Sequence, residues 1–203
     1  MGSRKRGWDV MKELRTIRIP ALGAPRLQAV YAAVGEVGME GDYAQFGVYR
    51  GRTARMIAAL TSKGRKLHLF DSFEGLPEDW VATKKAGHFS LAPDEIPEFD
   101  PKVAVIHKGW FNETVPTFVI DRKAPLAFIH LDADLYSSTV DVLFNANSII
   151  ARDTIILFDE YAIERWETDD EHRALTDWVD KFGRGFDYLW RSQTVQVCVR
   201  ITK

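Results

Sequence analysis

The stretch Ile129 to Thr139, with the sequence IHLDADLYSST, runs an apolar strand directly into two carboxylates, Asp132 and Asp134, and a cluster of hydroxyls. A buried strand that ends in acidic residues usually ends at a functional site, because carboxylates are costly to bury without partners. A strand in which nearly every side chain is apolar is typical of a parallel sheet that is covered on both faces. The stretch therefore predicts an α/β fold with a polar site where this strand ends.

A second stretch, Thr154 to Tyr161 with the sequence TIILFDEY, repeats the arrangement by placing Asp159 and Glu160 after a β-branched apolar run. In a parallel sheet, neighbouring strands end at the same edge, so the acids of the two stretches are expected to converge in one crevice. Convergent carboxylate oxygens suit a hard cation such as Mg²⁺. The two stretches together predict a divalent metal site.

The composition is that of an ordinary globular chain: 203 residues, of which 46% are hydrophobic and 28% are charged, fit a single domain over residues 1–203. The formal net charge of -2 offers no basic field for nucleic acid, and the only basic cluster, at residues 4–6, is expected to be a solvated tail. Residues 1–25 are expected to form an N-terminal extension. No apolar run is long enough to span a bilayer or to act as a secretion signal, so we expect no membrane partner and a cytoplasmic location. The oligomeric state, including a homo-oligomer, stays open.

The single cysteine, Cys198, excludes a disulfide within the chain. It lies in an alternating apolar run, where a thiol usually packs as a small apolar side chain. We therefore expect Cys198 to be a core residue.

Strand-like and helix-like segments alternate along the chain. Residues 26–37 and 170–182 predict helices, and residues 186–191 and 194–201 predict an antiparallel hairpin with a very short link. Further strands are predicted, with helical patterns between most of them, at residues 43–47, 66–71, 103–107, 126–132 and 154–159. This alternation predicts a mostly parallel sheet with helices on both faces and a closing antiparallel hairpin.

Residues 72–102 interrupt this alternation, because their glycines and prolines are too frequent for a regular element. A loop this long in a compact domain is usually functional or disordered. Its aromatic residues Phe73, Trp80, Phe89 and Phe99 favour an ordered cover. We expect a long loop or lid over the site; a surface loop without function is the alternative.

The first predicted strand leads into the turn Gly47 to Gly51, followed by a helix. Glycines let a ligand approach the backbone at such a turn, although tight helix packing would explain them equally well. Asp71 ends the next predicted strand, about 20 to 25 residues farther on, where a carboxylate in this architecture binds ribose hydroxyls. The turn lacks the G-x-G-x-x-G cradle for a pyrophosphate, which disfavours a nicotinamide-linked oxidoreductase and favours a sulfonium nucleoside such as S-adenosylmethionine.

Six short motifs follow one another along the chain: FGVYRG (46–51), FDSFEGLP (70–77), GHF (87–89), KGWF (108–111), DADLYSST (132–139) and FDEY (158–161). In this order they resemble the macrocin O-methyltransferase (TylF-like) family, and the resemblance covers roughly residues 42–178. It implies a Rossmann-like class I methyltransferase fold, S-adenosylmethionine as cofactor, and methylation of a hydroxyl on a sugar or other natural-product intermediate. It also implies a divalent metal such as Mg²⁺.

The resemblance implies a role for each matching residue. Gly47 and Gly51 would flank the methionine part of the cofactor, and Asp71 would hold its ribose. Ser72 and Phe73 would border the adenosine, with Gly109 and Trp110 near the adenine and further cofactor contacts from Phe46, Tyr49, Thr53 and Asp132.

The resemblance likewise assigns the chemistry. Asp132, Asp159 and Glu160 would be the metal ligands. Asp132 and Asp134 would be catalytic, with Asp134 as the general base or as a further ligand. His88 is an alternative base.

Several of these residues have plainer interpretations. Asp134 would serve equally as the N-cap of a helix that begins near Leu135, and Asp159 and Glu160 would accept backbone hydrogen bonds or pair with Arg173. His130 is expected to be a hydrogen-bonded core residue, and His172 to lie on a charged helix face. A catalytically silent module that binds S-adenosylmethionine and acts through a partner is the alternative function.

Overall fold

The computed structural model describes residues 5–18, 23–120, 122 and 124–203. In this part of the chain, the strands are β1 (Asp42–Phe46), β2 (Leu67–Asp71), β3 (Ala104–Lys108), β4 (Leu126–Leu131), β5 (Ile150–Phe158), β6 (Phe186–Arg191) and β7 (Val197–Ile201). The α-helices are α1 (Gly7–Glu13), α2 (Pro25–Gly35), α3 (Arg52–Leu60), α4 (Phe111–Ile120), α5 (Tyr136–Asn145) and α6 (Asp170–Phe182). Short 3₁₀ turns lie at Pro93–Glu95, Asn147–Ile149 and Glu164–Trp166.

The strands form one sheet in the order β3-β2-β1-β4-β5-β7-β6. The first five strands are parallel, and β7 is antiparallel to both β5 and β6, which confirms the predicted closing hairpin. The expected very short link was wrong, because β7 begins only at Val197. The Ser192 hydroxyl donates to Gln196 Oε1 at 2.6 Å and closes a longer loop.

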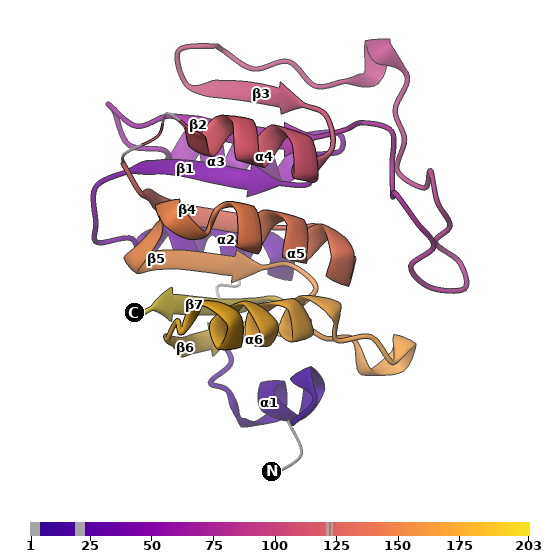
Figure 1. Ribbon diagram of the computed structural model, residues 1–203, viewed down its shortest axis with the longest axis vertical. Helices are drawn as coiled ribbons and strands as arrows, with labels where there is room; N and C mark the ends of the chain where they lie inside the picture. Colours follow the sequence, from indigo (N-terminus) through magenta and orange to yellow (C-terminus); the bar gives the residue numbers. More distant parts are fainter. Residues whose placement is uncertain (1–4, 19–22, 121, 123) are drawn as a thin grey trace.

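Helices cover both faces of the sheet, as predicted. Figure 1 shows α4, α5 and α6 on the near face and α2 and α3 behind the strands. Each face has its own apolar core, one including Val142 and Trp178 from the near helices and the other including Val30 and Ile57 from the far helices. All six side chains of β4 are buried, which is why its sequence is apolar apart from His130.

The predicted core position of Cys198 is confirmed, since its side chain is fully buried on the face covered by α2 and α3. No described helix is long and apolar enough to cross a membrane.

The described part of the N-terminal extension is not a free tail. Met11 of α1 is buried in the core, and the carbonyl oxygen of Lys5 lies 3.1 Å from His172 Nε2. The expectation that His172 lies on a charged helix face was wrong, because this face of α6 is buried. His172 Nδ1 bonds the hydroxyl of Tyr161 at 2.7 Å. Residues 1–4, which include part of the basic cluster, lie outside the described residues.

The segment 72–102 extends past the carboxyl ends of the parallel strands, at the right of Figure 1. Its aromatic side chains contact the body of the protein: Phe89 packs edge-to-face on Tyr49 with ring centres 5.5 Å apart, and Trp80 on Trp166 at 5.4 Å. These contacts favour an ordered cover. Movement of the segment as a lid stays a prediction.

Candidate active site

A cavity opens at the carboxyl edge of the sheet, where β1 and β4 lie side by side. The chain adds β2 and β3 on one side of β1 and then crosses over to β4 and β5 on the other side. Ligands bind at such a topological switch point, because the loops after the two strands diverge there. Residues that follow five strand ends line the cavity, among them Gly47, Tyr49, Asp71, Ser72, Gly109, Trp110, Asp132, Asp134 and Glu160.

The predicted cofactor residues divide into two sets. Seven of them line the cavity: Gly47, Tyr49, Asp71, Ser72, Gly109, Trp110 and Asp132. Phe46, Thr53 and Phe73 are buried and, like Gly51, are not among the lining residues. A Cβ on Gly51 would lie 3.0 Å from Pro97 and 3.1 Å from Phe99, so this glycine lets the segment 72–102 pack closely. The structure therefore does not place these four residues at the cavity surface.

Gly47 is required by the approach of β4. Its φ is +85°, and an added Cβ would fall well inside the van der Waals distance of the Asp132 carbonyl oxygen. The Asp132 amide in turn donates a hydrogen bond to the carbonyl oxygen of Phe46 at 2.9 Å. Glycine is therefore needed at position 47 because β1 and β4 pack closely at the switch point. The sequence had suggested ligand access or helix packing as the reason.

Asp71 organises the loops around it. Its Oδ2 accepts hydrogen bonds from the amides of Val48 at 2.7 Å and Tyr49 at 2.8 Å, and its Oδ1 accepts one from Phe73 at 2.7 Å. A carboxylate offers about four lone-pair positions, so a hydroxyl donor can still bind to it. Asp71 thus holds the glycine turn in place and remains able to accept a ribose hydroxyl.

The acids after β4 and β5 converge, as their positions predicted. Single ligand atoms of Asp132, Asp134 and Glu160 lie within 4.8 Å of one another, and so do those of His130, Asp132 and Asp159. The predicted triad of Asp132, Asp159 and Glu160 is thus divided between two groups that share Asp132. His130 is fully buried, but neither of its ring nitrogens has a hydrogen-bond partner among the described residues, which contradicts the expected hydrogen-bonded core role.

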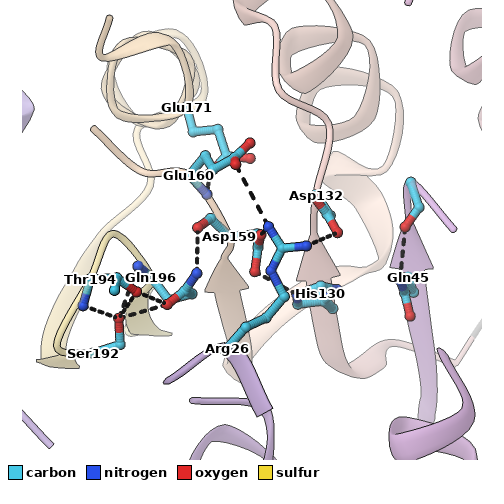
Figure 2. A network of polar contacts seen from close by, with 11 residues as sticks. Arg26, Gln45, His130, Asp132, Asp159, Glu160, Glu171, Ser192, Thr194 and Gln196 are labelled. Atoms are coloured by element: carbon cyan, nitrogen blue, oxygen red, sulfur yellow. Dashed lines mark hydrogen bonds and ion pairs between the residues drawn. The ribbon is translucent and has the colours of Figure 1, made fainter. Parts of the chain in front are cut away.

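Arg26, at the start of α2, is the partner of the acids that sequence reasoning missed. Figure 2 shows its guanidinium between the ends of β4 and β5. It is ion-paired with Asp159 and lies 3.6 Å from Glu160 Oε1 and 3.8 Å from Asp132 Oδ2. Burial lowers the pKa of Arg26, but the surrounding carboxylates outweigh it and raise this pKa further. No local pattern marked Arg26, because its partners lie far away in the sequence.

Two plainer interpretations are wrong. Arg173 does not pair with Asp159 or Glu160; its Nη1 lies 3.5 Å from Asp170 Oδ1. The N-cap of α5 is Leu135, without a side-chain cap, so Asp134 does not cap this helix.

The acids are crowded and poorly solvated. Burial and the charge of Asp159 raise the pKa of Asp132 to about 8, and burial raises the pKa of Asp159 to about 7 against the opposing effect of Arg26. Glu171 of α6, also missed, is fully buried and accepts a hydrogen bond from the Glu160 amide at 3.0 Å. Burial raises the pKa of Glu171 well above its usual range. Such crowding favours binding of a cation.

Backbone strain is concentrated at the cavity. Tyr49, Phe89 and Asp134 all line it and have positive φ values of 48°, 73° and 60°. Residues other than glycine rarely adopt this backbone conformation. Strain of this kind, about 1 to 3 kcal/mol per residue, usually persists where it positions a functional group. Burial and hydrogen bonding with Glu160 raise the pKa of Asp134 well above its usual range.

The sequence matches known O-methyltransferases. The family model of macrocin-O-methyltransferase (TylF) matches residues 3–181. The chain is 28% identical to demethyldecarbamoylnovobiocin O-methyltransferase of Streptomyces niveus, over 79% of this chain and 70% of that protein. It is 31% identical to 8-demethyl-8-(2,3-dimethoxy-alpha-L-rhamnosyl)-tetracenomycin-C 4'-O-methyltransferase of Streptomyces olivaceus, over 70% of this chain and 62% of that protein. The chain thus spans less than three quarters of the length of either relative.

The fold matches solved methyltransferase structures. The O-methyltransferase NovP superposes with a TM-score of 0.71 at 20% identity, covering 88% of this chain and 80% of NovP. The calicheamicin methyltransferase CalS11 superposes with a TM-score of 0.69 at 23% identity, covering 86% and 76% of the two chains. The predicted Rossmann-like class I fold is confirmed.

Proposed function

Since the chain belongs to the macrocin-O-methyltransferase (TylF) family, it is an S-adenosylmethionine-dependent O-methyltransferase of sugar or natural-product biosynthesis, and we propose that a divalent metal assists it. The observation that supports this proposal best is the meeting of Asp71 with the acids of β4 and β5 around one cavity. The acceptor is a hydroxyl of a small molecule that enters this cavity beside the cofactor.

The charge of the cavity suits the cofactor. S-adenosylmethionine, when bound, supplies a methyl group on a positively charged sulfonium. Asp132, Asp134 and Glu160 line the cavity and attract this charge, whereas they would repel the pyrophosphate of a nicotinamide dinucleotide. Asp71 would accept the ribose hydroxyls, and Gly109 and Trp110 would border the adenine.

The acidic cluster fits a divalent cation. His130 has unpartnered ring nitrogens, and its ligand atom lies within 4.8 Å of ligand atoms of Asp132 and Asp159, which is a donor set that a metal ion accepts. We infer that Asp132, Asp159 and Glu160 hold the ion, with Asp134 beside them and a ring nitrogen of His130 as a further donor. The ion would lower the pKa of the acceptor hydroxyl.

Asp134 is the proposed general base. It lines the cavity between Asp132 and the first turn of α5, so its carboxylate can take the proton of an acceptor hydroxyl there. A positioned base usually contributes about 10² to 10⁴-fold to the rate. His88 is less suitable, because its Nε2 lies 2.8 Å from Lys84 Nζ and it is not among the lining residues.

A transfer assay tests the function as a whole. Methyl-labelled S-adenosylmethionine is offered together with sugar-bearing and phenolic acceptors, with and without Mg²⁺, and label in the acceptor is measured. Metal-dependent labelling would support the proposal. Tight binding of S-adenosylhomocysteine with no labelling of any acceptor would favour the catalytically silent module.

Asp71→Ala should weaken the binding of S-adenosylhomocysteine about tenfold or more, because hydrogen bonds to a charged group contribute about 1.5 to 3 kcal/mol. Isothermal calorimetry measures the change. Asp79→Ala is the matched control, since Asp79 also accepts a backbone hydrogen bond, from Ala86 at 2.9 Å, but is not among the lining residues. Wild-type affinity in a folded Asp71→Ala protein would refute the assignment.

S-adenosylhomocysteine should protect the segment 72–102 from proteolysis. A ligand that binds only when this segment is closed over the cavity stabilises the closed conformation. Trypsin cleavage after the exposed Lys85 should slow several-fold at saturating ligand, as measured by mass spectrometry of the fragments. Cleavage after Lys63, which is exposed outside this segment, should not change. Equal rates at Lys85 with and without ligand would exclude a cofactor-coupled lid.

A further inference from the structure

We propose that Arg26 and the divalent cation are alternative occupants of the acidic cluster, so that metal binding displaces the Arg26 side chain and Arg26 sets the metal affinity. The inference rests on the proposed metal-assisted function. It makes Arg26 a positioning residue, which holds the acids in place when the metal is absent.

The contacts of Arg26 coincide with the expected metal ligands. Its Nη2 pairs with Asp159 and lies 3.6 Å from Glu160, and its Nη1 lies 3.8 Å from Asp132 (Figure 2). These three carboxylates, on the ends of two neighbouring strands, are the ones predicted to hold the ion. The guanidinium therefore occupies the space between the acids that a cation would use.

Electrostatics makes the two occupants compete. A guanidinium and a divalent ion among the same carboxylates would lie a few ångströms apart, where like charges repel strongly in a poorly solvated site. Asp159 on its strand end is fully buried, whereas the Arg26 side chain is 42% exposed. Arg26 can thus move toward solvent when a cation enters, and Asp159 cannot follow it.

Arg26 also leaves polar groups without partners. Among the described residues, the two ring nitrogens of His130 and Oε1 of Glu171 form no hydrogen bond, although both side chains are fully buried. His130 Nε2 lies 3.6 Å from Asp159 Oδ1, directly beside the ion pair. A metal ion can accept the nitrogen lone pair that Arg26 does not reach. The unpartnered His130 therefore indicates that a second occupant fits this position better.

The location of Arg26 couples the site to α2. Arg26 follows Pro25, the first residue of this helix, and it lines the cavity itself. Displacement would free the guanidinium at the cavity wall without unfolding the helix, whose Val30 and Ala33 are buried in the core. Loading of the metal would thus change the charge that the cavity presents to the acceptor.

Calorimetric titration with Mg²⁺ tests the competition. Arg26→Gln should bind Mg²⁺ about tenfold more tightly than the wild type or better, and Arg26→Lys, which keeps the charge on a different head group, should fall between them. Arg173→Gln is the control for lost positive charge, because Arg173 pairs with Asp170 outside the cluster, and its Mg²⁺ affinity should equal that of the wild type. S-adenosylhomocysteine binding by each variant verifies its fold.

The displacement itself has a direct signal. The side-chain Nε–H resonance of Arg26, identified by its absence in Arg26→Gln, should move on addition of Mg²⁺ to the position of a solvated arginine. Equal or weaker Mg²⁺ binding by Arg26→Gln or Arg26→Lys, or an unchanged resonance in the metal-loaded wild type, would overturn the inference and leave the metal site standing. If no protein binds Mg²⁺ while all bind S-adenosylhomocysteine, both the inference and the proposed metal fail.

Discussion

Asp132→Asn should abolish methyl transfer, by about 10³-fold or more, and leave the affinity for S-adenosylhomocysteine nearly unchanged. Asp132 belongs to both groups of ligand atoms that lie within 4.8 Å of one another, so its loss removes a charged ligand from either arrangement. Loss of several kcal/mol of charge stabilisation corresponds to an effect of this size. Most of the proposed cofactor contacts lie at other strand ends, including Asp71. Single-turnover assays and calorimetry measure the two quantities separately.

Chelation of the wild type should reproduce the Asp132→Asn result and should be reversed by added Mg²⁺. Asp159→Asn should behave in the same way. Asp134→Asn is the contrasting variant: as the base, it should keep metal binding and lose about 10² to 10⁴-fold in rate. Its residual rate should rise with pH, because the acceptor hydroxyl then ionises unaided. Full activity after exhaustive chelation would eliminate the metal mechanism.

Gly47→Ala should destabilise the protein by about 2 to 4 kcal/mol and lower Tm by about 5 °C or more. The added Cβ would overlap the backbone carbonyl of Asp132, and alanine is disfavoured at the φ of +85°. Because β1 and β4 would have to separate at the switch point, binding of S-adenosylhomocysteine should fall at least tenfold as well. Thermal melting and calorimetry record both effects.

Gly35→Ala is the matched control for Gly47→Ala. Gly35 is the last residue of α2, and a Cβ there would have no heavy atom within 4 Å. Alanine is favoured over glycine in a helix by up to about 1 kcal/mol, so Tm should stay constant or rise slightly and cofactor affinity should not change. A Gly47→Ala protein that melts and binds like the wild type would show that Gly47 is not needed at the switch point.

The sheet could be predicted because each of its parallel strands coincides with a short, contiguous run of mostly apolar residues. Predicted strand ends differ from the observed ends of β1 to β5 by one residue at most. The start of β5 was missed, since Arg152 and Asp153 are exposed and break the apolar run, yet β5 begins at Ile150. The helix α1 was missed as well, because its seven residues are held by tertiary contacts such as the burial of Met11.

The acids of the site were predictable for the same local reason, whereas their partners were not. Asp132, Asp134, Asp159 and Glu160 directly follow strands, and parallel strands bring their ends together. Glu171 and His172 stand next to a charged residue, Arg173, in the sequence, so only the docking of α6 shows that both are buried. The unpartnered state of His130 likewise depends on its surroundings.

The α/β alternation, the acids at the strand ends and the family could all be predicted from contiguous residues, because hydrophobic runs, turns and motifs are local properties of the chain. The folded chain was needed to show that Arg26 lies among those acids and that the Asp132 carbonyl approaches Gly47 closely. Both contacts join residues that are far apart in the chain. Their distances follow from the register of β1 against β4 and from the packing of α2, which no local pattern encodes.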